Sequence, residues 1–286
     1  MHELKLVECP RDAMQGIKGF IPTEKKAEYI NALLGVGFDT IDFGSFVSPK
    51  AIPQMADTAL VLSKLDWSPE KSKLLAIIAN VRGAMEAAMF EPITYLGFPF
   101  SVSETFQQRN TNSSITESLK RVEEIQNLCV KYGKQLVLYI SMGFGNPYGD
   151  PYSPEIVMKW VEKMISMSIR VISLADTIGV ADPQIISMLF SHLIPAYPQI
   201  EFAAHLHTTP DTWKEKIDAA YTHGCRRFDG ALKGYGGCPM AKDELTGNMA
   251  TENLLSFFQE KKIELELNEA ALGRSMKIAD EIFMNA

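Results

Sequence analysis

Two histidines one residue apart, His205 and His207, are the residues of this sequence whose spacing most directly suggests chemistry. They close the apolar run 200–204, and they are two of only five histidines in the chain. Residues i and i+2 of a strand lie on one face, so the spacing predicts two imidazoles directed at one point. We interpret the pair as part of a divalent-metal site. The alternative is that each imidazole is only a hydrogen-bonded group at the edge of a core.

Eight short runs rich in apolar and β-branched residues alternate with longer helical patterns and must position these histidines. The runs cover residues 4–8, 40–43, 74–78, 93–97, 135–140, 171–174, 201–205 and 227–232. A doubly wound sheet usually has about five to seven strands. Eight strands with helical connectors instead indicate an α/β fold of the (β/α)8 TIM-barrel type.

Start and stop signals define several of the connecting helices. A helix is expected over 23–34, because Pro22 precedes it and Gly35 follows it. Further starts are predicted at Ser114-Ile115-Thr116-Glu117, Ser153-Pro154, Asp182-Pro183 and Pro210-Asp211. The eighth barrel helix is expected over about 251–261, and an extra amphipathic helix over 268–284 packs outside the barrel. We therefore expect one catalytic domain over 1–286, with a barrel over about 3–262 and a C-terminal helical extension over about 266–286.

Polar residues follow several of the strand candidates at the carboxyl end, where barrel enzymes hold their active sites. Arg11 and Asp12 follow the first strand, Asp42 lies in the second, and Asp176-Thr177 follows the sixth. Asp and Thr are also common helix N-caps, so a purely structural role for Asp176 and Thr177 stays open.

Two imidazoles and one carboxylate form a mixed nitrogen and oxygen site that suits Mg²⁺, Mn²⁺ or another borderline divalent ion, and Asp12 is the best carboxylate candidate. Arg11 either only orients Asp12 or acts as a fixed positive charge that stabilises an enolate. Cys238 lies in a glycine loop after the eighth strand. Its thiol could exchange a proton there, or the loop could be only a turn that needs positive φ.

Composition and charge limit the classes of binding partner and the cellular compartments that we expect for the protein. The net charge is −7 and no Lys/Arg run occurs, which argues against a nucleic-acid partner but allows a small anionic ligand. The four cysteines show no C-x-x-C spacing, which is typical of reduced thiols in a cytoplasmic protein. No apolar run of 18 residues and no export signal are present, so no membrane association is expected.

Taken together, these segments resemble the 3-hydroxy-3-methylglutaryl-CoA lyase family, a group of metal-dependent barrels that make or break carbon–carbon bonds by aldol or Claisen chemistry. The resemblance runs almost end to end. The matching segments begin at Val7-Glu8-Cys9-Pro10-Arg11-Asp12, Ser45-Phe46-Val47-Ser48-Pro49-Lys50, Ser103-Glu104-Thr105-Phe106, Asp176-Thr177-Ile178-Gly179, Gly236-Gly237-Cys238-Pro239 and Gly247-Asn248-Met249-Ala250.

The resemblance implies a metal site of four ligands, which are Asp12, His205, His207 and Asn248. Asn248 enters only through this resemblance. It also implies retro-Claisen cleavage of an acyl-CoA substrate to acetoacetate and acetyl-CoA. The implied catalytic residues are Arg11 at the enolate oxygen, Asp12 or Asp42 as the base, and Cys238 as the proton donor, with Asp176 near the metal. Residues that hold the CoA moiety are not identifiable, and a homo-oligomer is possible because many barrel enzymes form one.

The chain departs from the family at several positions, and three other functions stay open. Asp42-Phe43-Gly44 stands where the family has Glu-Thr-Thr, and Thr208 stands where it has Asp. The first alternative is a lyase or aldolase acting on another 3-hydroxy acid or its CoA thioester. The second is a condensing acyltransferase of the isopropylmalate-synthase kind, and the third is a catalytically silent metal-binding barrel. No G-x-G-x-x-G follows the first strand, so no nucleotide redox cofactor is expected.

Overall fold

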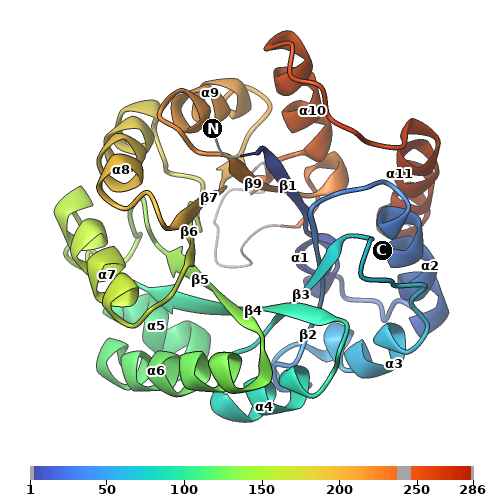
Figure 1. Ribbon diagram of the computed structural model, residues 1–286, viewed down its shortest axis with the longest axis horizontal. Coiled ribbons are helices and arrows are strands. Elements are labelled where there is room, and N and C mark those ends of the chain that lie inside the picture. Colours follow the sequence, from blue (N-terminus) through green and yellow to red (C-terminus); the bar gives the residue numbers. More distant parts are fainter. Residues whose placement is uncertain (1–2, 237–245, 285–286) are drawn as a thin grey trace.

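The computed structural model describes residues 3–236 and 246–284, and these form a closed barrel of parallel strands (Figure 1). Each strand pairs with the next along the chain, and the last pairs with the first. The barrel strands in order are β1 (Lys5–Glu8), β2 (Thr40–Ser45), β3 (Lys73–Ile77), β4 (Ile93–Ser101), β5 (Gln135–Ser141), β6 (Val171–Ala175), β7 (Glu201–His205) and β9 (Arg227–Gly230). The predicted (β/α)8 fold is confirmed.

Helices surround the strands on the outside, as the ring in Figure 1 shows. The helices that follow the strands or lie between them are α1 (Pro10–Gln15), α2 (Thr23–Leu34), α3 (Thr58–Leu62), α4 (Val81–Ala88), α5 (Glu104–Thr111), α6 (Ile115–Tyr132), α7 (Pro154–Ser166), α8 (Pro183–Ala196), α9 (Trp213–Thr222) and α10 (Thr251–Glu260). Two short 3-10 turns, η1 (Pro53–Met55) and η2 (Leu232–Gly234), lie in loops. An additional helix, α11 (Glu269–Phe283), packs beside α2 outside the barrel, as expected.

Local capping explains why several helices begin where the sequence predicts. Ser114 and Glu117 form a reciprocal capping box at the start of α6. The side chains of Ser153 and Asp182 accept hydrogen bonds from the first turns of α7 and α8. Gly35 ends α2 with ordinary negative φ, and a side chain there would lie 3.5 Å from Ala271 of α11. The nearest atom to that Cβ would be the Ala32 carbonyl oxygen of α2 itself, at 3.3 Å, so the packing of α11 alone does not require glycine here.

Two expectations about element boundaries need correction, and one strand pair was not expected. The eighth barrel strand ends at Gly230, because the backbone turns into η2, where Lys233 has a φ of 62°. The helix expected from Pro210-Asp211 begins at Trp213. An unpredicted antiparallel pair, β8 (His207–Thr208) and β10 (Gly247–Asn248), lies at the carboxyl end of the barrel.

The barrel has apolar packing on both sides of its strands. The main core lies between strands and helices, and it includes Phe43 and Phe228. A smaller apolar cluster fills one side of the lumen, with Leu75, Val137 and Tyr139 among its members. Among the described residues, the longest helices are too short or too polar to cross a membrane.

Candidate metal centre and active site

His205 and His207 converge at the carboxyl end of the barrel, although they do not belong to one strand. His205 is the last residue of β7, whereas His207 begins β8 in the separate antiparallel pair. The two ring centroids are 5.4 Å apart. The prediction that the two imidazoles lie together is confirmed, but the premise of a common strand face was wrong.

Asn248 reaches the same place through β10. In the β8–β10 pair its Cα partner is His207, so the ladder sets the two residues side by side. The Asn248 Nδ2 donates to Asp12 Oδ2 at 2.8 Å and to the Tyr235 carbonyl at 2.9 Å. Both bonds use the amide nitrogen, which leaves Oδ1 as the atom available to a cation. The structure thus brings Asn248 to the histidines, as the resemblance implied.

Asp12 lies on α1, directly after β1, and its carboxylate is already oriented by hydrogen bonds. Its Oδ1 accepts from Arg11 Nη1 at 2.8 Å and from Gln15 Nε2 at 2.7 Å. Burial opposes ionisation, but the charges of Arg11 and of the two imidazoles outweigh it and lower the pKa of Asp12 to about 2. Asp12 is therefore a carboxylate at neutral pH, as a metal ligand must be.

The strongest indication that a cation fits here is His207. Its side chain is buried, and neither ring nitrogen makes a hydrogen bond of standard length and angle to a described residue, although the Thr177 backbone lies close enough to raise the pKa of His207 slightly. Burial and the neighbouring His205 lower the pKa of His207 to about 4, so the imidazole is neutral at pH 7. Buried polar atoms are normally satisfied. Ligand atoms of Asp12, His205 and His207 lie within 4.8 Å of one another, so one ion could contact all three.

Asp229 orients His205, and the sequence analysis missed it. Its Oδ2 lies 3.0 Å from His205 Nδ1, and the two residues are register partners on the neighbouring strands β9 and β7. Burial works against the charged imidazole, but the Asp229 hydrogen bond outweighs it and raises the pKa of His205. A carboxylate bonded to Nδ1 leaves Nε2 free for a metal. Strand alternation and register were the only signals that could have revealed this pair.

A second group of potential ligands, Cys9, His205 and Asp229, also lies within 4.8 Å. Burial and several nearby carboxylates raise the pKa of Cys9 well above its usual value, so its thiol stays protonated. The bond between Asp229 and His205 occupies the nitrogen that such a site would need. The group with Asp12 is therefore the better candidate for a metal centre.

Arg11 and Asp42 form a buried pair beside the metal centre. Arg11 Nε donates to both carboxylate oxygens of Asp42, at 3.2 and 3.0 Å, while its Nη1 reaches Asp12. Burial raises the pKa of Asp42 to about 6 even though Arg11 lowers it. Arg11 thus fixes two carboxylates of different basicity, so orientation is at least one of its roles. Phe43 alternates with Asp42 and packs in the main core, away from the lumen.

Asp176 and Thr177 are not helix N-caps, because Asp182 caps α8. Asp176 instead accepts from Lys216 Nζ at 2.8 Å, and this buried lysine also donates to the His207 carbonyl at 2.9 Å. Thr177 Oγ1 accepts from Met142 N at 2.8 Å. These contacts hold the loop after β6 against β8. Burial raises the pKa of Asp176 despite its lysine partner.

The glycine loop after η2 packs directly on the metal centre. Gly236 has a φ of 87°, and a Cβ there would lie 2.7 Å from the Asp12 carbonyl and 2.8 Å from Asn248 Nδ2. Only glycine fits this position. The positive φ that the turn interpretation requires is therefore present, and Gly236 also lies close to Asp12 and Asn248. Cys238, the predicted proton donor, lies outside the described residues.

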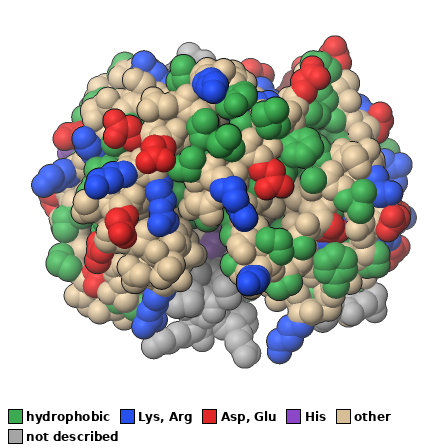
Figure 2. All heavy atoms as spheres, turned by 90° about the horizontal axis from the view of Figure 1, so that it is seen from below, with side chains coloured by type: hydrophobic (Ala, Val, Ile, Leu, Met, Phe, Trp, Pro, Cys, Tyr) green, Lys and Arg blue, Asp and Glu red, His purple; other side chains and the backbone are tan. Residues whose placement is uncertain are grey.

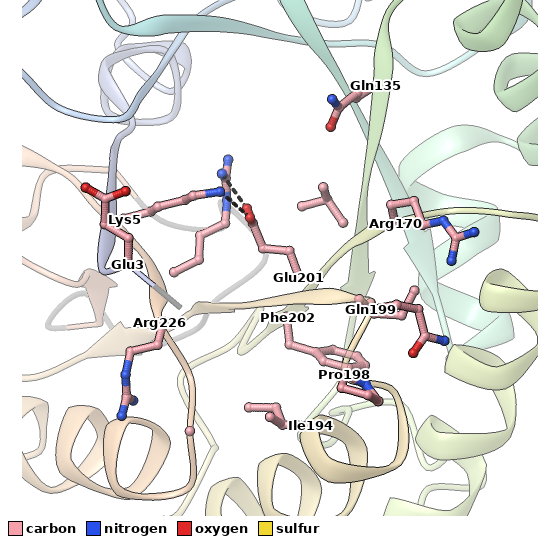
Figure 3. Close-up of a pocket in the computed structure, with 14 residues that line it drawn as sticks. Glu3, Lys5, Gln135, Arg170, Ile194, Pro198, Gln199, Glu201, Phe202 and Arg226 are labelled. Atoms are coloured by element: carbon pink, nitrogen blue, oxygen red, sulfur yellow. Dashed lines mark hydrogen bonds and ion pairs between the residues drawn. The ribbon is translucent and has the colours of Figure 1, made fainter. Parts of the chain in front are cut away.

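The opposite end of the barrel contains a different polar cluster (Figure 3). A cavity of about 400 Å³ opens at the first residues of β1, β5, β6, β7 and β9. Lys5 and Arg227 both contact Glu201 there, whereas Arg226 stacks over Tyr221 at 4.2 Å. The side chains of Lys5, Arg227 and Glu201 are thus paired across β1, β9 and β7. Their role is to stabilise the barrel, as is typical of this end.

The side view in Figure 2 shows a histidine side chain in a hollow at the lower margin of the molecule. On this face the basic and acidic side chains are interspersed, without a broad patch of either sign.

Comparison with known proteins gives consistent matches over nearly the whole chain. The HMGL-like family model matches residues 4–279. The cytoplasmic 3-hydroxy-3-methylglutaryl-CoA lyase of Danio rerio is 34% identical over 88% of this chain and 75% of its own length. The hydroxymethylglutaryl-CoA lyase of Bacillus subtilis is 32% identical over 95% and 90%. A solved HMG-CoA lyase of Acinetobacter baumannii, in complex with coenzyme A and 3-methylmalate, has a TM-score of 0.89 and 31% identity over 98% of this chain and 91% of that one.

Proposed function

Because this chain belongs to the HMGL-like family, we propose that it is a divalent-metal-dependent carbon–carbon lyase that cleaves 3-hydroxy-3-methylglutaryl-CoA to acetoacetate and acetyl-CoA. The family resemblance seen in the sequence is confirmed by these matches. The observation that carries the proposal is His207, which is buried and neutral beside an ionised Asp12, and whose ring nitrogens make no hydrogen bond of standard geometry within residues 3–236 and 246–284.

We infer that Asp12, His205, His207 and the amide oxygen of Asn248 would hold the cation. When bound, it would supply Lewis-acid polarisation of substrate oxygens. The two oxygen ligands suit Mg²⁺ or Mn²⁺, and the two imidazoles also admit another borderline divalent ion, so we propose Mg²⁺ or Mn²⁺ as the first ions to test. Asp229 fixes the tautomer of His205, and Gln15 with Arg11 fixes the Asp12 carboxylate.

Cleavage of the 3-hydroxyacyl group needs a base for the hydroxyl proton, and Asp42 suits this role better than Asp12. Both had been candidates. The pKa of about 6 keeps Asp42 close to the range in which a base both accepts and releases a proton, whereas the pKa of Asp12 is about 2. Breaking the bond between C2 and C3 leaves a ketone and the enolate of acetyl-CoA.

Arg11 lies where a fixed positive charge can stabilise the enolate oxygen. Its guanidinium stays protonated because burial, which opposes the charge, is outweighed by Asp42 and Asp12, and its pKa is raised. Protonation of the enolate carbon completes the reaction, and Cys238 stays the proposed donor on the basis of the family motif.

Incubation of the Mg²⁺- or Mn²⁺-loaded protein with 3-hydroxy-3-methylglutaryl-CoA tests the function. We expect acetoacetate and acetyl-CoA in equal amounts, and loss of both in His207→Ala. His192→Ala is the matched control, because His192 is exposed on α8. If acetoacetate forms with neither Mg²⁺ nor Mn²⁺, the assignment as a lyase is wrong. Release of free CoA from acetyl-CoA plus a 2-keto acid would indicate a condensing enzyme instead.

We further infer a cytoplasmic location and an acyl-CoA partner. Cys9, Cys129 and Cys225 are free and buried, which suits a reducing compartment. The Acinetobacter relative is described with coenzyme A bound, which supports the CoA thioester as the substrate form. A homo-oligomer stays a prediction, which sedimentation analysis can test.

A further inference from the structure

Glu8 is a buried carboxyl group that the proposed mechanism does not use. It is the last residue of β1 and is 0% exposed. The next residue, Cys9, lies near His205 in the lumen, so Glu8 is on the outer side of the strand. A carboxyl group in this position is costly unless its oxygens are hydrogen-bonded.

The two oxygens of Glu8 bind two segments that are distant in sequence from β1. Oε1 accepts from the Leu232 backbone N–H at 2.8 Å, and Oε2 accepts from the Thr251 hydroxyl. Leu232 begins η2, whereas Thr251 begins α10. These residues bound the stretch 232–251, which carries Gly236 and Asn248, and its residues 237–245 are not among those described.

The ends of this stretch are coupled to the metal centre by short connections. Ala231 N donates to the Met249 carbonyl at 2.9 Å, so the two ends also bind each other. Asn248, which precedes Met249, donates hydrogen bonds from its Nδ2 to the Tyr235 carbonyl and to Asp12 Oδ2. A shift of either end would therefore move Asn248 relative to Asp12.

We propose that Glu8 is a positioning residue that clamps both ends of the stretch 232–251 to β1 and so fixes Asn248 beside Asp12 and His207. The effect on catalysis rests on the proposed function. The effect on metal affinity rests only on the inferred ligand set, which includes Asn248, and not on the reaction that is catalysed.

The proposal predicts different Mn²⁺ affinities for Glu8→Gln and Glu8→Met. A glutamine can accept from the Leu232 N–H through its oxygen and donate to the Thr251 hydroxyl through its nitrogen, so both bonds survive. Methionine has a similar length and makes neither bond. We expect wild-type Mn²⁺ affinity in Glu8→Gln and a loss of about tenfold in Glu8→Met, the lower end of what outer-shell partners cost.

Titration calorimetry with Mn²⁺ and amide hydrogen exchange at residues 232–236 and 246–251 measure these effects. Lys134→Met is the control for general destabilisation, because Lys134 Nζ binds three carbonyls at the opposite end of the barrel. It should leave Mn²⁺ affinity unchanged. Wild-type affinity and exchange in Glu8→Met would overturn the clamp.

Thr251→Val keeps the inference testable if Glu8→Met does not fold. It removes one of the two bonds without changing the shape of the side chain, and we expect weaker Mn²⁺ binding and faster exchange in 246–251. Unchanged affinity in folded Thr251→Val would also overturn the proposal. If the wild-type protein binds Mn²⁺ but cleaves no acyl-CoA, the proposed function fails while the clamp is still decided by these measurements.

Discussion

Burial gives the ionisable side chains around the histidines different protonation states at neutral pH. Asp12 stays ionised because cationic neighbours outweigh burial, whereas burial and His205 keep His207 neutral. These are the states in which carboxylate and imidazole bind metals. Asp12, His205 and His207 could be proposed as ligands from the sequence, because each of them ends or follows a predicted strand.

Asp229 belongs to the part of the site that the sequence did not reveal. Its role depends on the register between β7 and β9, which pairs it with His205. Register is a tertiary property, so a single sequence gives no direct signal for it.

Asp229→Asn should weaken Mn²⁺ binding by about 10- to 100-fold, because the amide no longer holds His205 in the tautomer that presents Nε2. Titration calorimetry measures the affinity. Asp182→Asn is the matched control, since Asn caps a helix as well as Asp does. Equal affinity in Asp229→Asn and the wild type would remove the orienting role.

The elements that the sequence predicted well are long or clearly capped. All eight barrel strands were expected, and α2 covers Thr23–Leu34 as predicted. The missed elements are short. β8 and β10 contain two residues each, too few for any periodicity, and so the position of Asn248 could not be derived from spacing. The tertiary pairing of these strands brings Asn248 beside His207 and so completes the proposed ligand set.

The glycine loop provides a test at the level of elements. Gly236→Ala should weaken Mn²⁺ binding strongly, because the new Cβ would collide with the Asp12 carbonyl and with Asn248 Nδ2. Gly133→Ala is the control. It also has positive φ, at 66°, but no atom lies within 4 Å of the new Cβ.

Strain from positive φ alone costs about 1 kcal/mol, and Gly133→Ala should show that cost in thermal unfolding with unchanged metal affinity. If the two variants lose stability equally and both bind Mn²⁺ with wild-type affinity, the contact of Gly236 with Asp12 and Asn248 does not contribute to metal binding.

At the scale of the whole molecule, we propose that the barrel and α11 form one domain over 1–286. Phe283 of α11 stacks on Tyr235 at 4.3 Å and packs edge-on against Tyr29 of α2, so the helix is tied to both the loop and the barrel. Chemical unfolding followed by tryptophan fluorescence and by circular dichroism should give coincident transitions. Two separated transitions would indicate an independent unit.

Stability should depend on pH through Glu8. Burial raises the pKa of Glu8 from 4.5 to about 8, and the other titratable groups near it are Glu252 of α10 and Tyr29 of α2. The unfolded chain releases this proton above pH of about 4.5, whereas the folded protein retains it to about 8. The wild type therefore loses stability across this window as the pH rises.

Glu8→Gln lacks this proton, so its stability relative to the wild type should grow between pH 4.5 and 8 and then level off. The expected gain is on the order of a few kcal/mol, since one pKa unit corresponds to about 1.4 kcal/mol. Urea unfolding at several pH values measures it. A difference that does not change with pH would contradict a protonated Glu8.

The position of the cation in a crystal soaked with Mn²⁺ tests the central claim most directly, because anomalous scattering locates the ion without assuming its ligands. The account predicts one strong peak bounded by the Asp12 carboxylate, the imidazoles of His205 and His207, and the Asn248 amide oxygen. A peak among Cys9, His205 and Asp229, or no peak at the carboxyl end of the barrel, would contradict it.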